Sequence, residues 1–373
     1  MNFSFWETDS WFSNIDYCII GSGITGLNCA IRIKEQQPNS KVIILEKGML
    51  PEGASTKNAG FACFGSISEI LDDLNSHSED EVIKLVEKRI KGLELLRKNL
   101  GDKIIDYQQH GGYELFTETD DELYQECLER ISEVNALLKP VFSEDVFQIS
   151  RNKFGFKKIQ KNLVYNKFEG QIDTGKMMTA LVKKAAENDI RILNNIEVAA
   201  YVETKNGISL ETNKFDFHTK KLIIATNGFA SRLGIDKVKP ARAQVLITKP
   251  LQHLPFKGTF HLDKGYYYFR NIGNRVLFGG GRNLDFKTEE TDITGLTDTI
   301  QNKLKELLQT CVLPDTDFEI EQSWSGIMGV GATKEPIMKE IGKNVYCGVR
   351  LGGMGIAIGS LVGKETADLV LKA

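Results

Sequence analysis

The chain has 373 residues, which is enough for two domains sharing one active site but short for three large ones. Its formal net charge of −3 gives no electrostatic reason to bind nucleic acid or an anionic membrane surface. No apolar stretch reaches the roughly 18 residues that span a bilayer, and no basic N-terminal segment precedes an apolar run. We therefore expect a cytoplasmic protein without membrane insertion.

The six cysteines form neither a CxxC pair nor a cluster with metal-ligand spacing. They are Cys18, Cys29, Cys63, Cys127, Cys311 and Cys347. Such isolated cysteines are typical of a reducing compartment. We predict no metal site.

The first part of the chain alternates short β-branched runs with helical patterns, which predicts an α/β fold. We expect a strand at 17–20, a helix at 24–35 and a strand at 41–45. Helical regions at 68–99 and 120–138 then flank a strand at 111–116. The strands at 17–20 and 41–45 are apolar throughout, as in a parallel sheet that is covered on both faces.

A glycine-rich turn follows the first strand and opens the first helix. It reads Gly21-Ser22-Gly23-Ile24-Thr25-Gly26, and Glu46 ends the second strand twenty positions later. The first glycine permits a tight turn, the second lets the backbone approach a pyrophosphate, and the third lets helix and strand pack closely. An acid after the second strand accepts hydrogen bonds from a ribose and repels a 2′-phosphate. The pattern therefore predicts FAD or NAD rather than NADP.

Further along, we expect a helix at 175–188 and strands at 191–193 and 220–225. A run of strands follows at 244–248, 259–261, 265–270 and 275–278, then a helix at 295–308, a strand at 345–347, a glycine loop and a final helix. The strand-rich middle differs from the α/β ends. We therefore predict a discontinuous Rossmann-like domain (1–76, 166–235 and 323–373) and a second, mixed-sheet substrate domain (77–165 and 236–322).

Five stretches resemble one enzyme family and are spread over almost the whole chain. They are 53–60 (Gly-Ala-Ser-Thr-Lys-Asn-Ala-Gly), 173–175 (Asp-Thr-Gly), 223–228 (Ile-Ile-Ala-Thr-Asn-Gly), 323–327 (Ser-Trp-Ser-Gly-Ile) and 348–359, which contains Gly352-Gly353-Met354-Gly355. They are similar to stretches of the FAD-dependent D-amino-acid oxidase-like superfamily, which includes glycine and sarcosine oxidases, and within it to the gamma-glutamylputrescine oxidoreductase-like branch. The resemblance implies that the Rossmann-like domain binds FAD.

The fingerprint and the resemblance together predict the cofactor contacts. These are Gly21, Gly23, Ile24, Thr25, Gly26, Glu46, Lys47, Ser55, Thr56, Lys57, Asn58, Ala59, Gly60, Val198, Ala225, Thr226, Gly228, Gly353, Met354, Gly355 and Ile356. A glycine loop that opens a helix offers N–H donors and a positive dipole to the negative charge of reduced flavin. Some relatives attach FAD through a cysteine near a stretch like 323–327. No cysteine lies there, so we expect non-covalent FAD.

The resemblance also implies the reaction. A small amine or amino acid would give a hydride from its α-carbon to flavin N5, and the imine would hydrolyse. In sarcosine-oxidase relatives a lysine that activates oxygen lies on a strand similar to 275–278, and here its place is taken by Leu277. The electron acceptor, oxygen or another molecule, therefore stays open.

Candidate substrate contacts lie on the strand at 265–270 and before the C-terminal glycine loop. Alternation along a strand puts Tyr266 and Tyr268 on one face with Arg270, and Tyr267 and Phe269 on the other. We predict that Tyr266 and Tyr268 contact substrate, the alternative being a packed sheet core. Arg350 is predicted to pair with a substrate carboxylate, the alternative being a salt bridge.

His261 and His110 are interpreted as structural histidines. Two other functions remain open at this point: an NAD-dependent dehydrogenase with the same fingerprint, and a non-catalytic flavin-binding module. The expected partners are a small amine or amino acid and an electron acceptor, with no nucleic acid.

Overall fold

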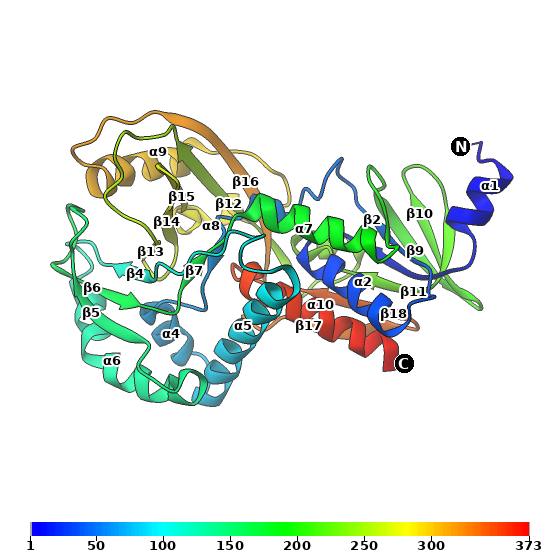
Figure 1. The fold of residues 1–373 in the computed structure, drawn as a ribbon, viewed down its shortest axis with the longest axis horizontal. Helices are drawn as coiled ribbons and strands as arrows, with labels where there is room; N and C mark the ends of the chain where they lie inside the picture. Colours follow the sequence, from blue (N-terminus) through cyan, green and yellow to red (C-terminus); the bar gives the residue numbers. More distant parts are fainter. Residues whose placement is uncertain (1, 373) are drawn as a thin grey trace.

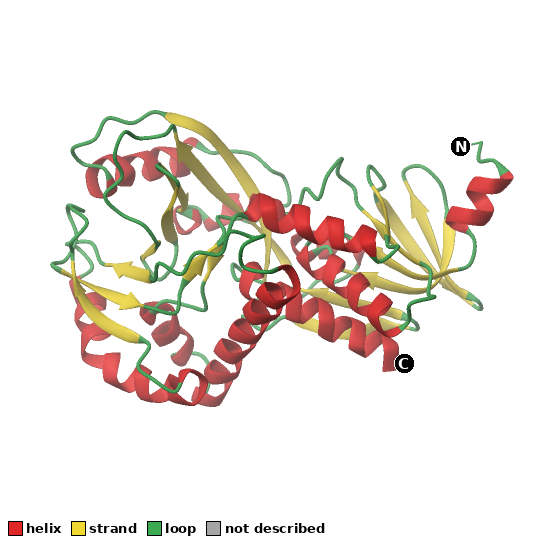
Figure 2. Cartoon of the chain, in the orientation of Figure 1, coloured by secondary structure: helices red, strands yellow, loops and turns green. Residues whose placement is uncertain are grey.

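The structure, a computed structural model, describes residues 2–372. These residues form two large mixed sheets at the two ends of an elongated molecule, with helices packed against both (Figure 1). The mixture of helices and strands that the sequence predicts is confirmed (Figure 2).

The first sheet lies at the right of Figure 1 and contains the N-terminal strand. Its parallel core has the order β18 (Val345–Val349), β11 (Phe217–Ile224), β1 (Ile15–Ile20), β2 (Val42–Leu45) and β8 (Arg191–Leu193). Antiparallel strands complete it: β17 (Ile337–Gly342) beside β18, and the hairpin of β9 (Val198–Thr204) and β10 (Gly207–Thr212) beside β11. Ile20 pairs with both Leu45 and Ile224, so the carboxyl ends of three strands meet.

Both faces of this sheet are covered, which is why residues 17–20 of β1 and 42–45 of β2 are apolar throughout. Helices α2 (Ile24–Gln36), α7 (Thr174–Glu187) and α10 (Gly355–Lys372) pack on the face that carries Ile19 and Ile44. The β9–β10 hairpin packs on the face that carries Ile20 and Leu45. Successive residues point to opposite faces, so one run of apolar residues supplies two cores.

The second sheet holds the strand-rich middle of the chain. Its order is β16 (Ile320–Val330), β12 (Lys239–Thr248), β15 (Arg275–Gly280), β14 (Tyr267–Ile272), β13 (Thr259–Leu262), β4 (Gly112–Leu115), β6 (Asn162–Asn166) and β5 (Phe147–Arg151). One face packs Phe260, Phe269 and Phe278 beneath α9 (Asp298–Leu307). On the other face, α4 (Ile67–Leu74) and α6 (Asp121–Phe142) cover the β4–β5 end.

The remaining elements are short apart from α5 (Glu79–Leu100), which crosses α10. A Cβ on Gly92 of α5 would lie 2.2 Å from the carbonyl oxygen of Ala357, so only glycine permits this crossing. The short elements are α1 (Phe5–Glu7), η1 (Thr8–Phe12), α3 (Ala54–Lys57), β3 (Phe61–Ala62), β7 (Gly170–Gln171), η2 (Asn227–Leu233), η3 (Arg282–Leu284), α8 (Phe286–Glu289) and η4 (Leu308–Val312). Among the described helices, none combines the length and the apolar character needed to cross a bilayer.

The elements differ from the sequence-based prediction at several places. The helical region expected at 68–99 is two helices, because Ser78 starts α5 with a capping box to Glu81. Strands β5, β6, β9, β10 and β17 were not predicted, and β16 lies in the second sheet although its residues from 323 onward were placed in the Rossmann-like domain. The domain boundaries themselves stay a prediction.

Candidate active site

A cavity of about 480 Å³ runs between the two sheets. At one end, the fingerprint end, its wall contains Gly21, Gly23, Thr25, Glu46 and Thr226. At the other, the tyrosine end, its wall contains His261, Tyr266, Tyr268, Arg282 and Met354. The cavity thus joins the carboxyl ends of β1, β2 and β11 to the open face of the second sheet.

Glycines are required in the fingerprint because neighbouring backbone leaves no room for a side chain. A Cβ on Gly26 would lie 2.0 Å from the carbonyl oxygen of Gly21, and Gly21 itself has a φ of 103°. Helix α2 begins at Ile24 after Gly23, which provides no capping side chain, and the N–H of Ile24 donates to Ser55 Oγ at 3.0 Å. The N–H of Leu27 donates to the carbonyl oxygen of Gly23 at 3.0 Å, whereas the N–H groups of Thr25 and Gly26 have no partner within the helix, and Thr25 lines the cavity.

Glu46 is buried at the carboxyl end of β2 and is held by three hydrogen bonds. Its Oε2 accepts from the backbone N (3.1 Å) and Oγ (2.7 Å) of Ser22, and its Oε1 accepts from the backbone N of Gly48 at 3.0 Å. Oε1 therefore keeps a lone pair for a further donor such as a ribose hydroxyl.

Two buried hydroxyls at the fingerprint end have no hydrogen-bond partner among the described residues. They are Thr25 Oγ1 and Thr226 Oγ1, and both residues line the cavity. Buried polar atoms are nearly always satisfied in folded proteins, so these orphans indicate a polar ligand. Together with the free first turn of α2, they fit a dinucleotide.

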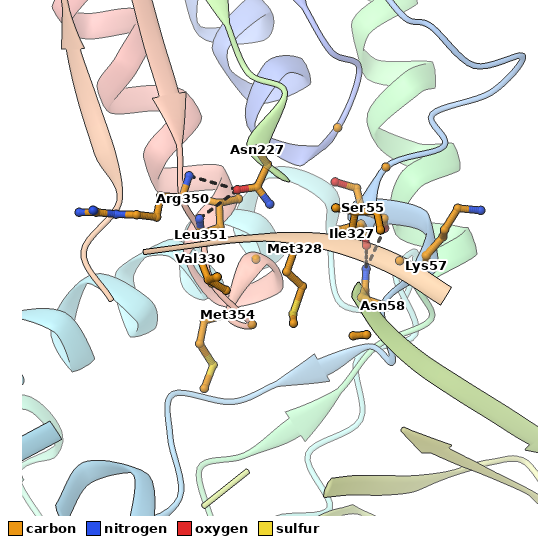
Figure 3. Close-up of a pocket in the computed structure, with 18 of the residues that line it drawn as sticks. Ser55, Lys57, Asn58, Asn227, Ile327, Met328, Val330, Arg350, Leu351 and Met354 are labelled. Carbon is orange, nitrogen blue, oxygen red and sulfur yellow. Dashed lines mark hydrogen bonds between the residues drawn. The ribbon is translucent and has the colours of Figure 1, made fainter. Parts of the chain in front are cut away.

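The C-terminal glycine loop is tied to the fingerprint end by one side chain (Figure 3). Asn227 Oδ1 accepts from the backbone N of Arg350 and of Leu351, each at 3.1 Å. These two hydrogen bonds, together with the left-handed conformation of Gly352, hold the loop so that α10 begins at the cavity. The sequence contained Asn227 in the 223–228 stretch but offered no signal for this role.

Most residues predicted to contact the cofactor line the cavity. These are Gly21, Gly23, Ile24, Thr25, Glu46, Lys47, Ser55, Lys57, Asn58, Ala59, Gly60, Val198, Ala225, Thr226, Gly353, Met354, Gly355 and Ile356. Gly26, Thr56 and Gly228 do not. Gly26 packs on Gly21, Gly228 would clash with the carbonyl oxygen of Met328 if it carried a Cβ, and Thr56 Oγ1 donates to the carbonyl oxygens of Pro51 and Gly53.

The hydrogen bonds of Arg350 favour a structural role over the predicted pairing with a substrate carboxylate. Its Nε donates to the carbonyl oxygen of Glu335 at 2.7 Å, and one terminal nitrogen donates to Thr333 Oγ1 at 2.9 Å. The side chain points away from Met328 and Met354 (Figure 3). These bonds fasten the 333–335 segment to the glycine loop, which is a structural use of the guanidinium.

Tyr266 and Tyr268 line the cavity, while Tyr267 and Phe269 belong to the aromatic core of the second sheet. The expected alternation holds from Tyr267 onward, where β14 begins; Tyr266 lies in the preceding turn and also packs against that core. Arg270 is buried but does not reach the cavity wall, and burial lowers its pKa to about 10 despite the nearby charges of Asp173 and Asp106.

Strand register builds the tyrosine end from residues that are far apart in the chain. Tyr268 pairs with His261 on β13 and with Gly279 on β15, and Gly279 pairs with Val245 on β12. A Cβ on Gly279 would lie 2.6 Å from the Tyr268 ring, so glycine makes room for that ring. One row of the pleated sheet therefore forms this part of the wall.

His261 is part of a buried charged network, which sequence reasoning missed. Its Nε2 lies 2.9 Å from Glu169 Oε2, and its ring packs against Phe61 with centroids 5.3 Å apart. Burial alone would lower the pKa of His261, but the charge of Glu169 and the hydrogen bond to it, with Glu69 and Glu114, raise it to about 9. The alternation of polar and apolar residues in Thr-Phe-His-Leu at 259–262 could have indicated this, because it places His261 on the face of the strand opposite to Phe260 and Leu262.

Glu114 is the other member of this network. It pairs with His261 across β4 and β13 and accepts from the backbone N of Ser68 at 3.0 Å and from the Ser68 hydroxyl. Burial raises the pKa of Glu114 to about 7, although the bonds from Ser68 act in the opposite direction.

The wall between the two ends is apolar and sulfur-rich. Cys63 Sγ lies 3.8 Å from Met354 Sδ, and Met328 lines the same region (Figure 3). Burial raises the pKa of the Cys63 thiol well above its ordinary value. No cluster of metal-ligating side chains occurs within residues 2–372. The site thus combines a polar fingerprint end, an apolar middle and a tyrosine end.

Comparison with known proteins decides between FAD and NAD. Residues 16–369 match the family described as FAD dependent oxidoreductase (DAO). The chain belongs to this family. It is therefore an FAD-dependent oxidoreductase, and the expectation drawn from the five stretches is confirmed.

Individual relatives are distant but match over nearly the whole chain. A probable oxidoreductase OrdL from Haemophilus influenzae is 22% identical over 95% of this chain and 83% of its own length. The gamma-glutamylputrescine oxidoreductase of Escherichia coli (strain K12) is 24% identical, with the same coverage of both chains. The crystal structure of glycine oxidase from Geobacillus kaustophilus superposes with a TM-score of 0.77, at 21% identity over 96% of this chain and 94% of that one. This similarity confirms the Rossmann-like flavoprotein fold.

Proposed function

We propose that the chain binds FAD non-covalently along the cavity and oxidises the C–N bond of a small amine or amino acid. The observation that carries the proposal is the continuity of the cavity, which joins the dinucleotide fingerprint, the C-terminal glycine loop and the tyrosine face. The names of two relatives, a glycine oxidase and a gamma-glutamylputrescine oxidoreductase, support a nitrogen-bearing substrate.

Different residues would bind the two halves of the cofactor. The first turn of α2 would hold the pyrophosphate, Glu46 a ribose hydroxyl, and the N-terminus of α10 the negative charge that develops on the flavin ring. Bound FAD supplies the hydride acceptor, flavin N5. Met328, Met354 and Phe61 exclude water from the reacting carbon, which favours the neutral amine over its ammonium form.

The low reactivity of the cysteine at the cavity supports non-covalent binding of FAD. Among the described residues Cys63 is the cysteine at the cavity wall, and its buried thiol with a raised pKa resists forming the reactive thiolate. Acid precipitation of the purified protein should leave all yellow colour in the supernatant. Colour that stays in the pellet would contradict this part of the proposal.

The reaction is tested by anaerobic bleaching of the bound flavin with a panel of primary, secondary and N-methyl amines and amino acids. Loss of the flavin absorbance with at least one member, and formation of the matching aldehyde, ketone or keto acid, is the expected result. A flavin that no member of the panel reduces would overturn the proposal. Repeating the reaction in air with peroxide detection identifies oxygen as the acceptor or excludes it.

A further inference from the structure

We propose that Arg270 stabilises the negative charge of the reduced flavin from behind Gly60 and so raises the midpoint potential of the bound cofactor. The inference goes beyond the proposed reaction and rests only on the binding of FAD along the cavity. It gives a function to a buried cation to which the proposed reaction assigns no role.

Three arginines are buried in the part of the chain that the structure describes, and they differ in their partners. Arg242 forms an ion pair with Glu289 through two hydrogen bonds of 2.9 and 2.8 Å. Arg89 donates to the carbonyl oxygen of Phe64 at 2.7 Å. Arg270 has neither an ion pair nor a hydrogen bond to any residue in the range 2–372, and its Nε is buried.

An unpaired guanidinium in the interior lowers the stability of the folded chain. Arg270 is only 5% exposed, and a charge that leaves water without gaining a partner is strongly disfavoured. Burial accordingly lowers the pKa of Arg270 to about 10. Because buried charges in folded proteins nearly always have a partner, this one indicates a partner that is bound from outside.

The acids whose charges act on Arg270 are paired with a lysine. Asp173 and Asp106 raise the pKa of Arg270 through their charges and not through hydrogen bonds. Lys176 Nζ lies 3.2 Å from Asp106 Oδ2 and 3.8 Å from Asp173 Oδ2. The two acid side chains are 43% and 41% exposed, so water screens their charges as well. Neither acid therefore neutralises Arg270.

The guanidinium of Arg270 lies against the cavity wall from behind. A Cβ on Gly60 would lie 3.0 Å from Nη2 of Arg270 and 2.4 Å from the carbonyl oxygen of Ile172. Gly60 lines the cavity and has a φ of 75°, a conformation that favours glycine. The guanidinium thus occupies the space that a side chain at position 60 would need.

Gly60 lies where the middle of the cavity is expected to hold the flavin ring. On its N-terminal side, Ser55 Oγ accepts from the backbone N of Ile24 at the fingerprint end. On its C-terminal side, the ring of Phe61 packs against Tyr268 with centroids 5.5 Å apart. A dinucleotide whose pyrophosphate lies at α2 would therefore extend its flavin along Gly60 towards the tyrosine end.

A buried and unpaired cation acts over a longer distance than a paired cation at the surface, because the interior screens its charge less than water and salt do. Reduction adds negative charge to the flavin, so the field of Arg270 stabilises the reduced form more than the oxidised form. A charge placed near the flavin ring is one of the means by which a protein adjusts this cofactor. Arg270 would act in the same direction as the N-terminus of α10.

The first experiment measures the midpoint potential of the flavin in the holoenzyme, by reduction with dithionite beside a reference dye. We expect Arg270→Met to shift the equilibrium towards oxidised flavin about tenfold, which lowers the potential by about 30 mV for a two-electron couple. Arg270→Lys keeps the charge and should retain most of the wild-type potential. The matched control is Arg275→Gln, which removes a partly exposed cation of the same hairpin that donates to the carbonyl oxygen of Thr248. Its potential should equal that of the wild type.

The second experiment separates this role from a structural one. Because the described residues offer Arg270 no partner, Arg270→Met should leave the Tm of the oxidised holoenzyme unchanged or raise it. An unchanged potential in Arg270→Met, or an equal fall in Arg275→Gln, would overturn the inference. Arg270→Gln provides the same comparison if Met impairs folding, and failure of both variants to form a holoenzyme would assign Arg270 a structural role instead.

The outcomes also separate this inference from the proposed function. The potential is measured without any amine, so a flavin that no amine reduces leaves the test of Arg270 intact. If amines reduce the flavin and Arg270→Met has the wild-type potential, only the role of Arg270 fails.

Discussion

The two ends of the cavity are built in different ways. The fingerprint end consists of short contiguous segments at strand ends, where backbone N–H groups and missing side chains define the surface. The tyrosine end consists of single side chains from β13, β14 and η3, which come together only through strand pairing and chain crossing.

This difference separates two kinds of recognition. A site made of backbone is specified by local geometry, so it binds a ligand common to many proteins. A site made of side chains on paired strands can change its specificity one residue at a time while the sheet stays intact. Substitutions at the fingerprint end should therefore impair binding by distorting the fold, whereas substitutions at the tyrosine end should remove individual interactions.

The largest effect is expected from Gly26→Ala. The new Cβ would lie 2.0 Å from the carbonyl oxygen of Gly21, so α2 must move away from β1 and the pyrophosphate cradle opens. We expect purified protein without bound flavin and with a lowered Tm, measured by the ratio of absorbance at flavin and protein wavelengths. In the control Gly175→Ala the nearest atom is Asp173 Oδ1 at 3.3 Å, so flavin should be retained. Full flavin occupancy in Gly26→Ala would show that the cradle tolerates the shift.

A smaller effect, on the pH dependence of stability, is expected from the buried pair of His261 and Glu169 at the tyrosine end. His261 has a pKa of about 9 in the folded protein against 6.5 ordinarily, so between these values the folded state binds more protons than the unfolded state. The free energy of unfolding should therefore be highest below pH 6.5 and fall by roughly 2–3 kcal/mol as the pH rises to 9. Urea denaturation across this range measures the slope.

In His261→Gln this part of the pH dependence should disappear, and stability at low pH should drop because Glu169 loses its charged partner and keeps only neutral donors such as Thr259. His110→Gln is the control, since partial desolvation and the charge of Lys257 lower the pKa of His110, so it does not titrate above 6.5. An unchanged slope in His261→Gln would assign the pH dependence to other groups.

At the fingerprint end, Glu46→Gln tests a single side chain within a backbone site. The amide keeps one acceptor oxygen but loses the charge that binds Ser22 and Gly48 and that would bind a ribose hydroxyl. We expect the Kd of FAD for the apoprotein to rise about tenfold, a loss of about 1.4 kcal/mol, in a titration followed by flavin fluorescence. Glu52→Gln, an exposed acid on the same loop, should bind FAD as the wild type does. Equal affinity in the two variants would remove Glu46 from the set of cofactor contacts.

The smallest effect is expected from Tyr268→Phe. Loss of one hydroxyl at the cavity wall should lower kcat/KM for the best substrate by about 2- to 10-fold and leave flavin content unchanged. Tyr267→Phe is a matched control on the neighbouring residue, whose ring lies in the core of the second sheet. If Tyr267→Phe lowers kcat/KM as much as Tyr268→Phe, the hydroxyl of Tyr268 has no special role in substrate binding.

Prediction from the sequence succeeded where the signal is local. Gly21, Gly23 and Glu46 were placed at the cavity because a strand, a tight turn and a helix N-terminus follow one another within a few residues. Tyr268 was placed at the cavity because alternation along one strand is also local, whereas Tyr266 reaches the cavity from the turn before β14. The role predicted for Arg350 stays a prediction, because the closeness of this residue to the glycine loop in sequence says nothing about the direction of its side chain or about its bonds to Thr333 and Glu335.

The sequence by itself determined the fold class, the dinucleotide fingerprint and its preference against a 2′-phosphate. It could do so because glycine geometry, strand period and helix dipoles act over a few neighbouring residues. Only the tertiary structure decided that Asn227 anchors the C-terminal loop and that His261 lies between Glu114 and Glu169. These roles depend on strand register and on which charges already have partners, and both are settled only when distant segments of the chain pack together.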